Sequence, residues 1–211
     1  MKLQKIGGIG SIGTAILIVI ILVIITIVFP NLGLVGPSDW NDPVKIFDAM
    51  SASPITFFIF NLDFILFSIA SILVVLALRE RMYASAPNLM RLAMIGVSIS
   101  CALWLATGII GIVGMPSIVS AKDISAFRAV TTVHYALGGV AGYFTHGWTL
   151  LLIGWAALKT KSLSKILSYF LVLAGVVNIL EFVVQPLMFV TILLGIVWGL
   201  WLGIVLLRSK T

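Results

Sequence analysis

The chain has 211 residues, of which 61% are hydrophobic and 9% are charged, with a formal net charge of +6. A soluble domain carries about 25% charged residues because its surface must face water. Together with a mean hydropathy of +1.23, this composition excludes an ordinary soluble globule and indicates that lipid is the main solvent. The single cysteine, Cys101, excludes an internal disulfide and a cysteine-based metal cluster.

Six apolar stretches follow one another along the chain and predict one all-α membrane domain over residues 1–211, a polytopic bundle of six transmembrane helices. The first follows a short basic leader, so a signal peptide competes with a retained helix. Its apolar run exceeds the usual ~7–15 residues of a signal peptide, and no small-x-small cleavage site follows, which favours a helix. The spans cover about 9–29, 54–78, 89–115, 134–158, 164–182 and 186–207.

Local signals mark several boundaries. Ser53 is placed as an N-cap with Pro54 at the first helical position, and Pro116 is expected to stop the third span. In the long loop 31–53, Asp42 followed by Pro43 predicts a short helix over 43–50. Its apolar residues favour a position along the membrane surface, and an irregular loop is the alternative.

The basic residues predict the orientation. The N-terminus, the second and fourth loops and the C-terminus hold ten Lys and Arg, and the other loops hold three. By the positive-inside rule, both termini are expected on the cytoplasmic side of the cell membrane. The charge is thus a topology signal with some attraction to anionic lipid. No segment combines clustered Lys and Arg with stacking aromatics, so we expect no nucleic-acid partner.

Small residues at spacings of four predict where helices pack closely, because association in lipid depends on close contact. The sixth span carries Gly195, Gly199 and Gly203, and the fourth carries Gly138 and Gly142. Hinge or ligand-clearance roles are the alternative. Trp198 and Trp201, beside the first stripe, are expected to face lipid.

Ionisable residues inside a span are costly and are candidate functional residues. Asp63, His146 and Glu181 are the candidates away from the cytoplasmic ends of the spans, and Asn178 shares a helix face with Glu181. Counted from the basic residue that ends each span, all four lie ~20–24 Å from the cytoplasmic end, at ~1.5 Å per residue. The core is ~30 Å thick, so three helices place polar groups at one level of its outer half.

We therefore predict an outward-opening polar pocket formed by Asp63, His146, Asn178 and Glu181, able to bind a proton, a cation or a cationic solute. In the alternative, Asp63 and His146 form a structural pair and Glu181 marks the outer interface. Asn61 points almost opposite to Asp63 on a helix and is left outside the pocket. His134 counts to ~37 Å and is expected to be solvated or interfacial.

Several chemistries lack support in the sequence. The two histidines are twelve residues apart on one predicted helix, ~18 Å, too far to ligate one haem. No paired His or Glu-x-x-His spacing anchors a catalytic metal, and no nucleotide-binding or hydrolase fingerprint occurs. We expect no cofactor and no metal.

One region resembles a known family. His146–Trp155, the basic turn Lys159–Ser162 and Ile166–Val176 follow its pattern: an apolar run ending in Leu-x-x-Gly, a short basic turn and an apolar run ending in Ala-Gly. This is a prokaryotic family of six-helix membrane proteins of unknown function, and the similarity is best over 138–177. The usual proline of the turn is absent. The resemblance implies a bacterial or archaeal cell membrane, no established activity and no site residues.

Three function classes stay open. The bundle binds or moves a small solute, proton or lipid through the polar pocket, or it is a structural or accessory subunit that packs against partners or its own copies through glycine-rich faces. An intramembrane enzyme is the third.

Overall fold

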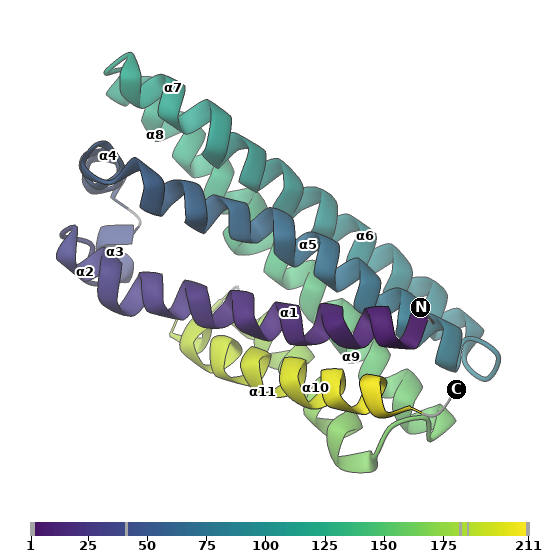
Figure 1. Cartoon of the computed structure of the whole chain (residues 1–211). Helices are drawn as coiled ribbons and strands as arrows, with labels where there is room; N and C mark the ends of the chain where they lie inside the picture. Colours follow the sequence, from purple (N-terminus) through teal and green to yellow (C-terminus); the bar gives the residue numbers. More distant parts are fainter. Residues whose placement is uncertain (1–2, 41, 182, 185, 210–211) are drawn as a thin grey trace.

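The computed structural model describes residues 3–40, 42–181, 183–184 and 186–209. Across these residues the regular structure is entirely helical (Figure 1). In chain order the elements are α1 (Leu3–Val23), η1 (Ile24–Val28), α2 (Phe29–Asn31), α3 (Pro37–Trp40), α4 (Pro43–Ala52), α5 (Pro54–Met82), α6 (Pro87–Ile109), η2 (Ile110–Gly114), α7 (Met115–Ser120), α8 (Ile124–His134), η3 (Tyr135–Gly142), α9 (Tyr143–Thr160), α10 (Lys165–Glu181) and α11 (Leu187–Arg208), where η denotes a π-helix.

Five helices are long and apolar enough to cross a membrane, which identifies a multi-pass membrane protein. Four are longer than the sequence predicts, because α1–α2, α6–α7 and α8–α9 each run on through a π-helical segment and α5 extends to Met82. The fifth predicted span, 164–182, corresponds to α10, which has 17 described residues and is shorter than these five. The five are Leu3–Asn31, Pro54–Met82, Pro87–Ser120, Ile124–Thr160 and Leu187–Arg208.

Pro116 does not stop its helix where the sequence predicts, and Pro30 likewise lies inside its helix. Pro30 and Pro116 each stand two residues after a π-helical segment, η1 and η2 respectively. A proline ring clashes with the carbonyl four residues earlier in an α-helix. The wider π turn shifts that carbonyl, so the third span continues past Pro116 to Ser120.

The caps of α4 and α5 differ in kind. Asp42 caps α4 as predicted, since its side chain accepts a hydrogen bond from the Val44 amide at 2.9 Å. Ser53 occupies the cap position of α5 without a side-chain bond to the helix backbone, and its hydroxyl instead lies 2.8 Å from that of Thr56. Ile46 and Met50 of α4 are buried within the protein rather than in lipid, because α4 packs on α8.

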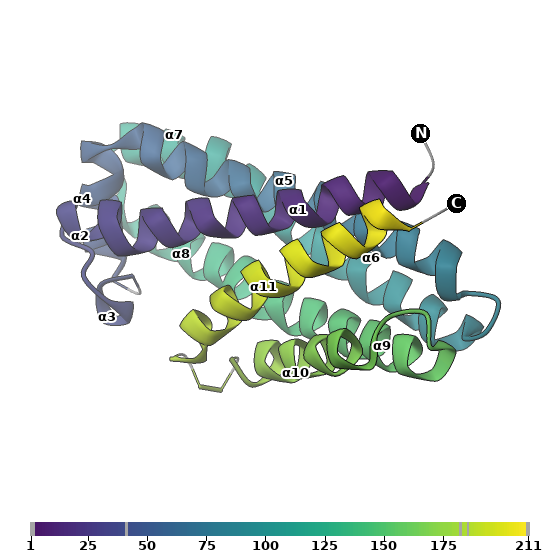
Figure 2. The same ribbon diagram turned by 60° about the horizontal axis from the view of Figure 1, so that its bottom comes forward.

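The long helices form a closed ring. Each contacts the next in the order α1, α5, α6, α9, α10, α11 and back to α1. Figure 2 shows α10 and α11 on the side of the bundle away from α7. The short helices α3 and α4 and the outer parts of α5, α7 and α8 gather at one end, which we call the outer end (Figure 1).

The chain termini mark the opposite end, which we call the basic end. Figure 1 shows both termini there, beside the turns that join α5 to α6 and α9 to α10. The described helix ends and turns at this end carry most of the basic residues, namely Lys5, Arg79, Arg81, Arg91, Lys159, Lys161, Lys165 and Arg208. Three bases and four acids lie at the outer end: Lys45, Lys122, Arg128, Asp39, Asp42, Asp48 and Asp123.

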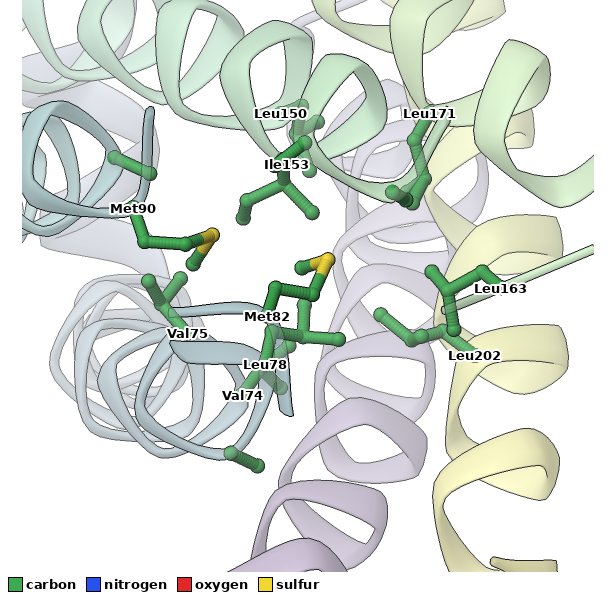
Figure 3. Close-up of a cluster of buried hydrophobic side chains, with 14 of the residues drawn as sticks. Val74, Val75, Leu78, Met82, Met90, Leu150, Ile153, Leu163, Leu171 and Leu202 are labelled. Atoms are coloured by element: carbon green, nitrogen blue, oxygen red, sulfur yellow. The ribbon is translucent and has the colours of Figure 1, made fainter. Parts of the chain in front are cut away.

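A cluster of buried apolar side chains fills the ring toward the basic end, and we call it the inner plug. Side chains from α5, α6, α9, α10 and α11 point toward one another there (Figure 3). Leu78, Met82 and Met90 have no exposed surface. The plug therefore closes the interior of the ring on the side of the termini. Its labelled members are Val74, Val75, Leu78, Met82, Met90, Leu150, Ile153, Leu163, Leu171 and Leu202.

Candidate functional site

Toward the outer end the ring encloses a cavity of about 220 Å³, which we call the main cavity. The residues that line it come from α1 to α5, from α7 to α9 with η3 between them, and from η1 and α11, with Glu181 at the end of α10. Most of the wall is apolar or aromatic, as is common in small-molecule sites. The aromatic members are Phe29, Trp40, Phe57, Phe60, Phe64, Tyr135 and Tyr143.

A smaller cavity of about 50 Å³ adjoins the main cavity on the side of the inner plug. The two share Asp63, Tyr143 and Thr191 among their lining residues. His146 lies at the smaller cavity among aromatic rings, 5.0 Å from the Trp104 centroid and 5.6 Å from that of Phe67. The smaller cavity thus extends the polar part of the main cavity inward and ends against aromatic side chains.

The four residues of the predicted pocket divide between the cavities. Asp63 lines both, Glu181 lines the main cavity, and His146 and Asn178 line the smaller one. No hydrogen bond joins Asp63 to His146 among those found in the described residues, so the alternative of a structural pair has no hydrogen bond to support it. Asp63 is the residue that connects the two groups.

Unpartnered polar atoms concentrate at these cavities. Eight buried side-chain N or O atoms of the described residues have no hydrogen-bond partner, and six of them belong to residues that line the cavities. In a low-dielectric interior each unmade hydrogen bond is costly, so such a cluster calls for a ligand or ordered water. The six are Asp63 Oδ1, Thr131 Oγ1, His146 Nδ1, Asn178 Oδ1, Glu181 Oε2 and Thr191 Oγ1.

Two residues that the sequence places outside the pocket belong to its wall. His134 and Asn61 both line the main cavity, and His134 Nε2 lies 2.7 Å from Asn61 Oδ1. The Asn61 amide nitrogen donates to the Phe57 carbonyl at 2.7 Å, so its oxygen is the acceptor and His134 the donor. His134 is half-buried at this level, with the Phe64 ring centroid 6.1 Å from its own.

Local backbone structure explains why sequence reasoning misses Asn61. Gly111 of η2 leaves the space that the Asn61 side chain fills, and a Cβ at that position would overlap the amide group. Asn61 therefore reaches the edge of the cavity between α5 and α8, while Asp63 reaches it from the other side of α5. A helical wheel correctly places Asn61 and Asp63 on nearly opposite faces of α5. It cannot show that the cavity reaches both faces of this helix.

The π-helical segments border the main cavity. Ile25 of η1 and Tyr135, Gly139 and Val140 of η3 line it, and Met115 directly follows η2. Single π turns inside α-helices occur frequently at functional sites, because they redirect side chains and leave backbone groups less regularly paired. Their placement agrees with a site at this level of the bundle.

The outer wall is held by the loop between α2 and α4. Asp39 accepts hydrogen bonds from Lys45 Nζ and from the Val35 amide. The hydrogen bond from Lys45 holds the pKa of the Asp39 carboxyl below its usual range, and the same bond raises the pKa of Lys45. Trp40 lies in this loop and donates from Nε1 to the Leu34 carbonyl at 3.1 Å.

The predicted packing glycines face neighbouring helices of the same chain. A Cβ on Gly195 would lie 2.7 Å from Ile18 of α1, and one on Gly203 would lie 2.6 Å from Ile12. Gly199 faces Ser11 and Ala15 of α1. Gly138 faces Thr107 and Gly142 faces Trp104, both on α6.

Trp198 is not lipid-facing as expected. It is 3% exposed and its ring lies 6.2 Å from that of His146. α11 presents Trp198 to the interior of the ring because the α10 and α1 contacts fix its rotation.

Comparison with known proteins gives no further identification. No family model, no curated protein and no solved structure matches this chain, so the resemblance over residues 138–177 has no support beyond its pattern. Within the described part of the chain, no group of three His, Cys, Asp or Glu is placed so that it could hold a metal ion.

Proposed function

We propose that the protein is a six-span protein of the cell membrane, with both termini in the cytoplasm, that binds a small amphipathic solute in the main cavity. The observation that carries the proposal is the coincidence of the cavities with six of the eight unpartnered buried polar atoms. An apolar wall with a few convergent polar groups is the usual form of a small-molecule site.

The direction of access follows from the same arrangement. The inner plug fills the ring on the basic side, and the main cavity lies beyond it toward the outer end. The positive-inside rule places the basic end in the cytoplasm. A solute therefore enters from the extracytoplasmic side or from the outer leaflet.

The count of six spans rests on α10. Its 17 residues correspond to ~25 Å at ~1.5 Å per residue, which is close to the ~30 Å core. The two termini lie at one end of the bundle, as an even number of crossings requires. α10 also lies between α9 and α11 in the ring, in contact with both.

Cysteine labelling tests this topology with little background, because Cys101 is only 2% exposed. Val35→Cys lies in an exposed outer loop and Ser85→Cys in the exposed turn between α5 and α6. An impermeant maleimide applied to intact cells should label the first variant, and should label the second only after lysis. The reverse pattern would invert the orientation.

A structural or accessory role through glycine faces is the weaker candidate. Such a role requires a glycine face that is free for a partner. The stripe Gly195, Gly199 and Gly203 is covered by α1, and Gly138 and Gly142 are covered by α6. These contacts favour packing within the chain over docking of a second protein.

A solute screen tests the binding proposal. The purified protein in lipid nanodiscs is melted with a panel of short amphipathic amines, alcohols and acids. A binding solute should raise Tm in the wild type and lose its effect in Thr191→Val, which removes one unpartnered hydroxyl of the cavities. Ser71→Ala is the matched control, because Ser71 is also buried and unpartnered but lines neither cavity. If no solute distinguishes these variants, the binding proposal fails.

A further inference from the structure

We propose that the solute is a primary amine with a short apolar body, whose ammonium group binds between Asp63, Glu181 and Thr191. This inference rests on the proposed binding function and names the chemical class of its ligand.

The charged residues in the wall of the cavities are acidic. Asp63 and Glu181 carry carboxyl groups, and no Lys or Arg is among the described residues that line either cavity. The salt bridge found in the described part of the chain is Lys45–Asp39, in the outer loop. A carboxylate held in a membrane bundle without a counter-ion is costly. A bound cation removes that cost at both residues together.

Three unpartnered hydrogen-bond acceptors accompany this charge. Asp63 Oδ1, Glu181 Oε2 and Thr191 Oγ1 each lack a partner, and all three residues line the main cavity. They come from three different helices, α5, α10 and α11. The Thr191 hydroxyl lies beside the Glu181 carboxyl group, which can take the hydroxyl proton and leave the hydroxyl oxygen to accept from a ligand. Asp63 and Thr191 are 8% and 7% exposed. An alkylammonium group has three N–H donors, as the lysine head group does, so it satisfies one acceptor on each helix.

The rest of the wall is suited to an apolar body beside a cation. Phe57, Phe60 and Phe64 of α5 and Tyr135 of η3 line the main cavity together with the polar groups. Aromatic rings attract cations through their faces and accept an apolar chain equally well. At about 220 Å³ the cavity suits a short body rather than a lipid chain.

The same features disfavour other ligand classes. A carboxylate or phosphate would place negative charge beside two acidic residues, and like charges brought together in a desolvated site repel strongly. A quaternary ammonium has no N–H and leaves the three acceptors unpartnered. An alcohol brings one donor and no charge.

The experiment uses four probes of equal chain length with the full-length protein in nanodiscs: hexylamine, hexyltrimethylammonium, hexanol and hexanoate. Hexylamine should raise Tm most, hexyltrimethylammonium and hexanol less, and hexanoate not at all. Asp63→Asn and Glu181→Gln should each weaken the apparent hexylamine affinity by at least about tenfold, since each removes one member of a buried charge pair. Ser71→Ala should leave it unchanged.

Each other outcome has a definite meaning. Equal shifts with hexylamine and hexanol, both lost in Thr191→Val, overturn the amine inference and leave the binding proposal in place. A hexylamine shift that persists unchanged in both Asp63→Asn and Glu181→Gln reports partition into lipid and also overturns it. If either variant does not fold, the ranking of the four probes on the wild type still decides. If none of the four probes raises Tm but the screen finds another solute that does, the amine inference is wrong and the proposed binding function stands.

Discussion

Replacement of Gly175 by alanine tests whether α10 is docked in the ring as described. A Cβ at this position would lie 2.6 Å from the Leu151 amide nitrogen and 2.7 Å from the Gly147 carbonyl oxygen of α9. Ordinary van der Waals contact begins at 3.4 Å, and both obstacles are backbone atoms, which cannot rotate away. α9 and α10 must therefore separate along their contact.

The magnitude follows from two opposed effects. Overpacking of a well-packed contact costs about 1–3 kcal/mol, and occasionally more. Alanine recovers up to about 1 kcal/mol over glycine inside a helix. Because backbone atoms meet the new methyl group on both sides, we expect the upper part of the range, a net loss of about 2 kcal/mol. For a chain of this size that corresponds to a fall of about 4–8 °C in Tm.

The assay is thermal melting of the detergent-purified variants followed by intrinsic tryptophan fluorescence. Gly13→Ala is the matched control, because Gly13 lies inside α1 and, apart from its own stretch of helix, nothing lies within 4 Å of the new Cβ. It should melt at or above the wild-type temperature. If Gly175→Ala has the same Tm as Gly13→Ala, the close contact between α9 and α10 is refuted, and with it the closed ring.

Other contacts of the structure can be tested in the same way. Gly199→Ala should lower Tm, since its Cβ would lie 3.0 Å from the Ser11 carbonyl and the Ser11 hydroxyl donates to the Gly199 carbonyl at 2.8 Å; an unchanged Tm would place α11 away from α1. A double-mutant cycle of Asn61→Ala and His134→Ala, read from the free energy of unfolding, should give a coupling of about 0.6 kcal/mol, the average for hydrogen bonds between membrane helices. If the effects of the two substitutions simply add, the hydrogen bond between Asn61 and His134 is refuted. In a titration followed by carbon NMR, the pKa of Asp39 should lie below 3.8 and rise in Lys45→Met. Because the pKa of Asp39 is lower in the folded than in the unfolded protein, the contact with Lys45 stabilises the loop above the pH range of this titration and is lost as the pH falls through it. An Asp39 pKa that is the same in the wild type and in Lys45→Met would contradict the ion pair between Asp39 and Lys45.

The coarse architecture is predictable from the sequence because composition and periodicity act over whole helices. Apolar runs and their basic ends indicate long membrane helices, and counting inward from those ends predicts Asp63, His146, Asn178 and Glu181 at one level. The structure places these four along two adjoining cavities. Whether they bind a ligand stays a prediction.

What the sequence could not supply depends on exceptions to regular helix geometry. η2 before Pro116 and η3 after His134 change the direction of side chains that a uniform 3.6-residue period misplaces. Depth alone predicts a solvated or interfacial His134 and cannot show its contacts with Asn61 and Phe64 of α5. Residue type alone assigns Trp198 to lipid, although α11 turns it inward beside His146.

Substituted-cysteine accessibility shows whether the main cavity is open toward the outside and closed toward the cytoplasm. Thr191→Cys places a thiol at both cavities, and Leu78→Cys places one in the inner plug, where Leu78 has no exposed surface. An impermeant trimethylammonium-ethyl methanethiosulfonate is applied from each side of oriented vesicles. We expect Thr191→Cys to react from the extracytoplasmic side only and Leu78→Cys to react from neither side. A Thr191→Cys thiol that stays unmodified from outside, or that reacts from the cytoplasmic side, would contradict this expectation.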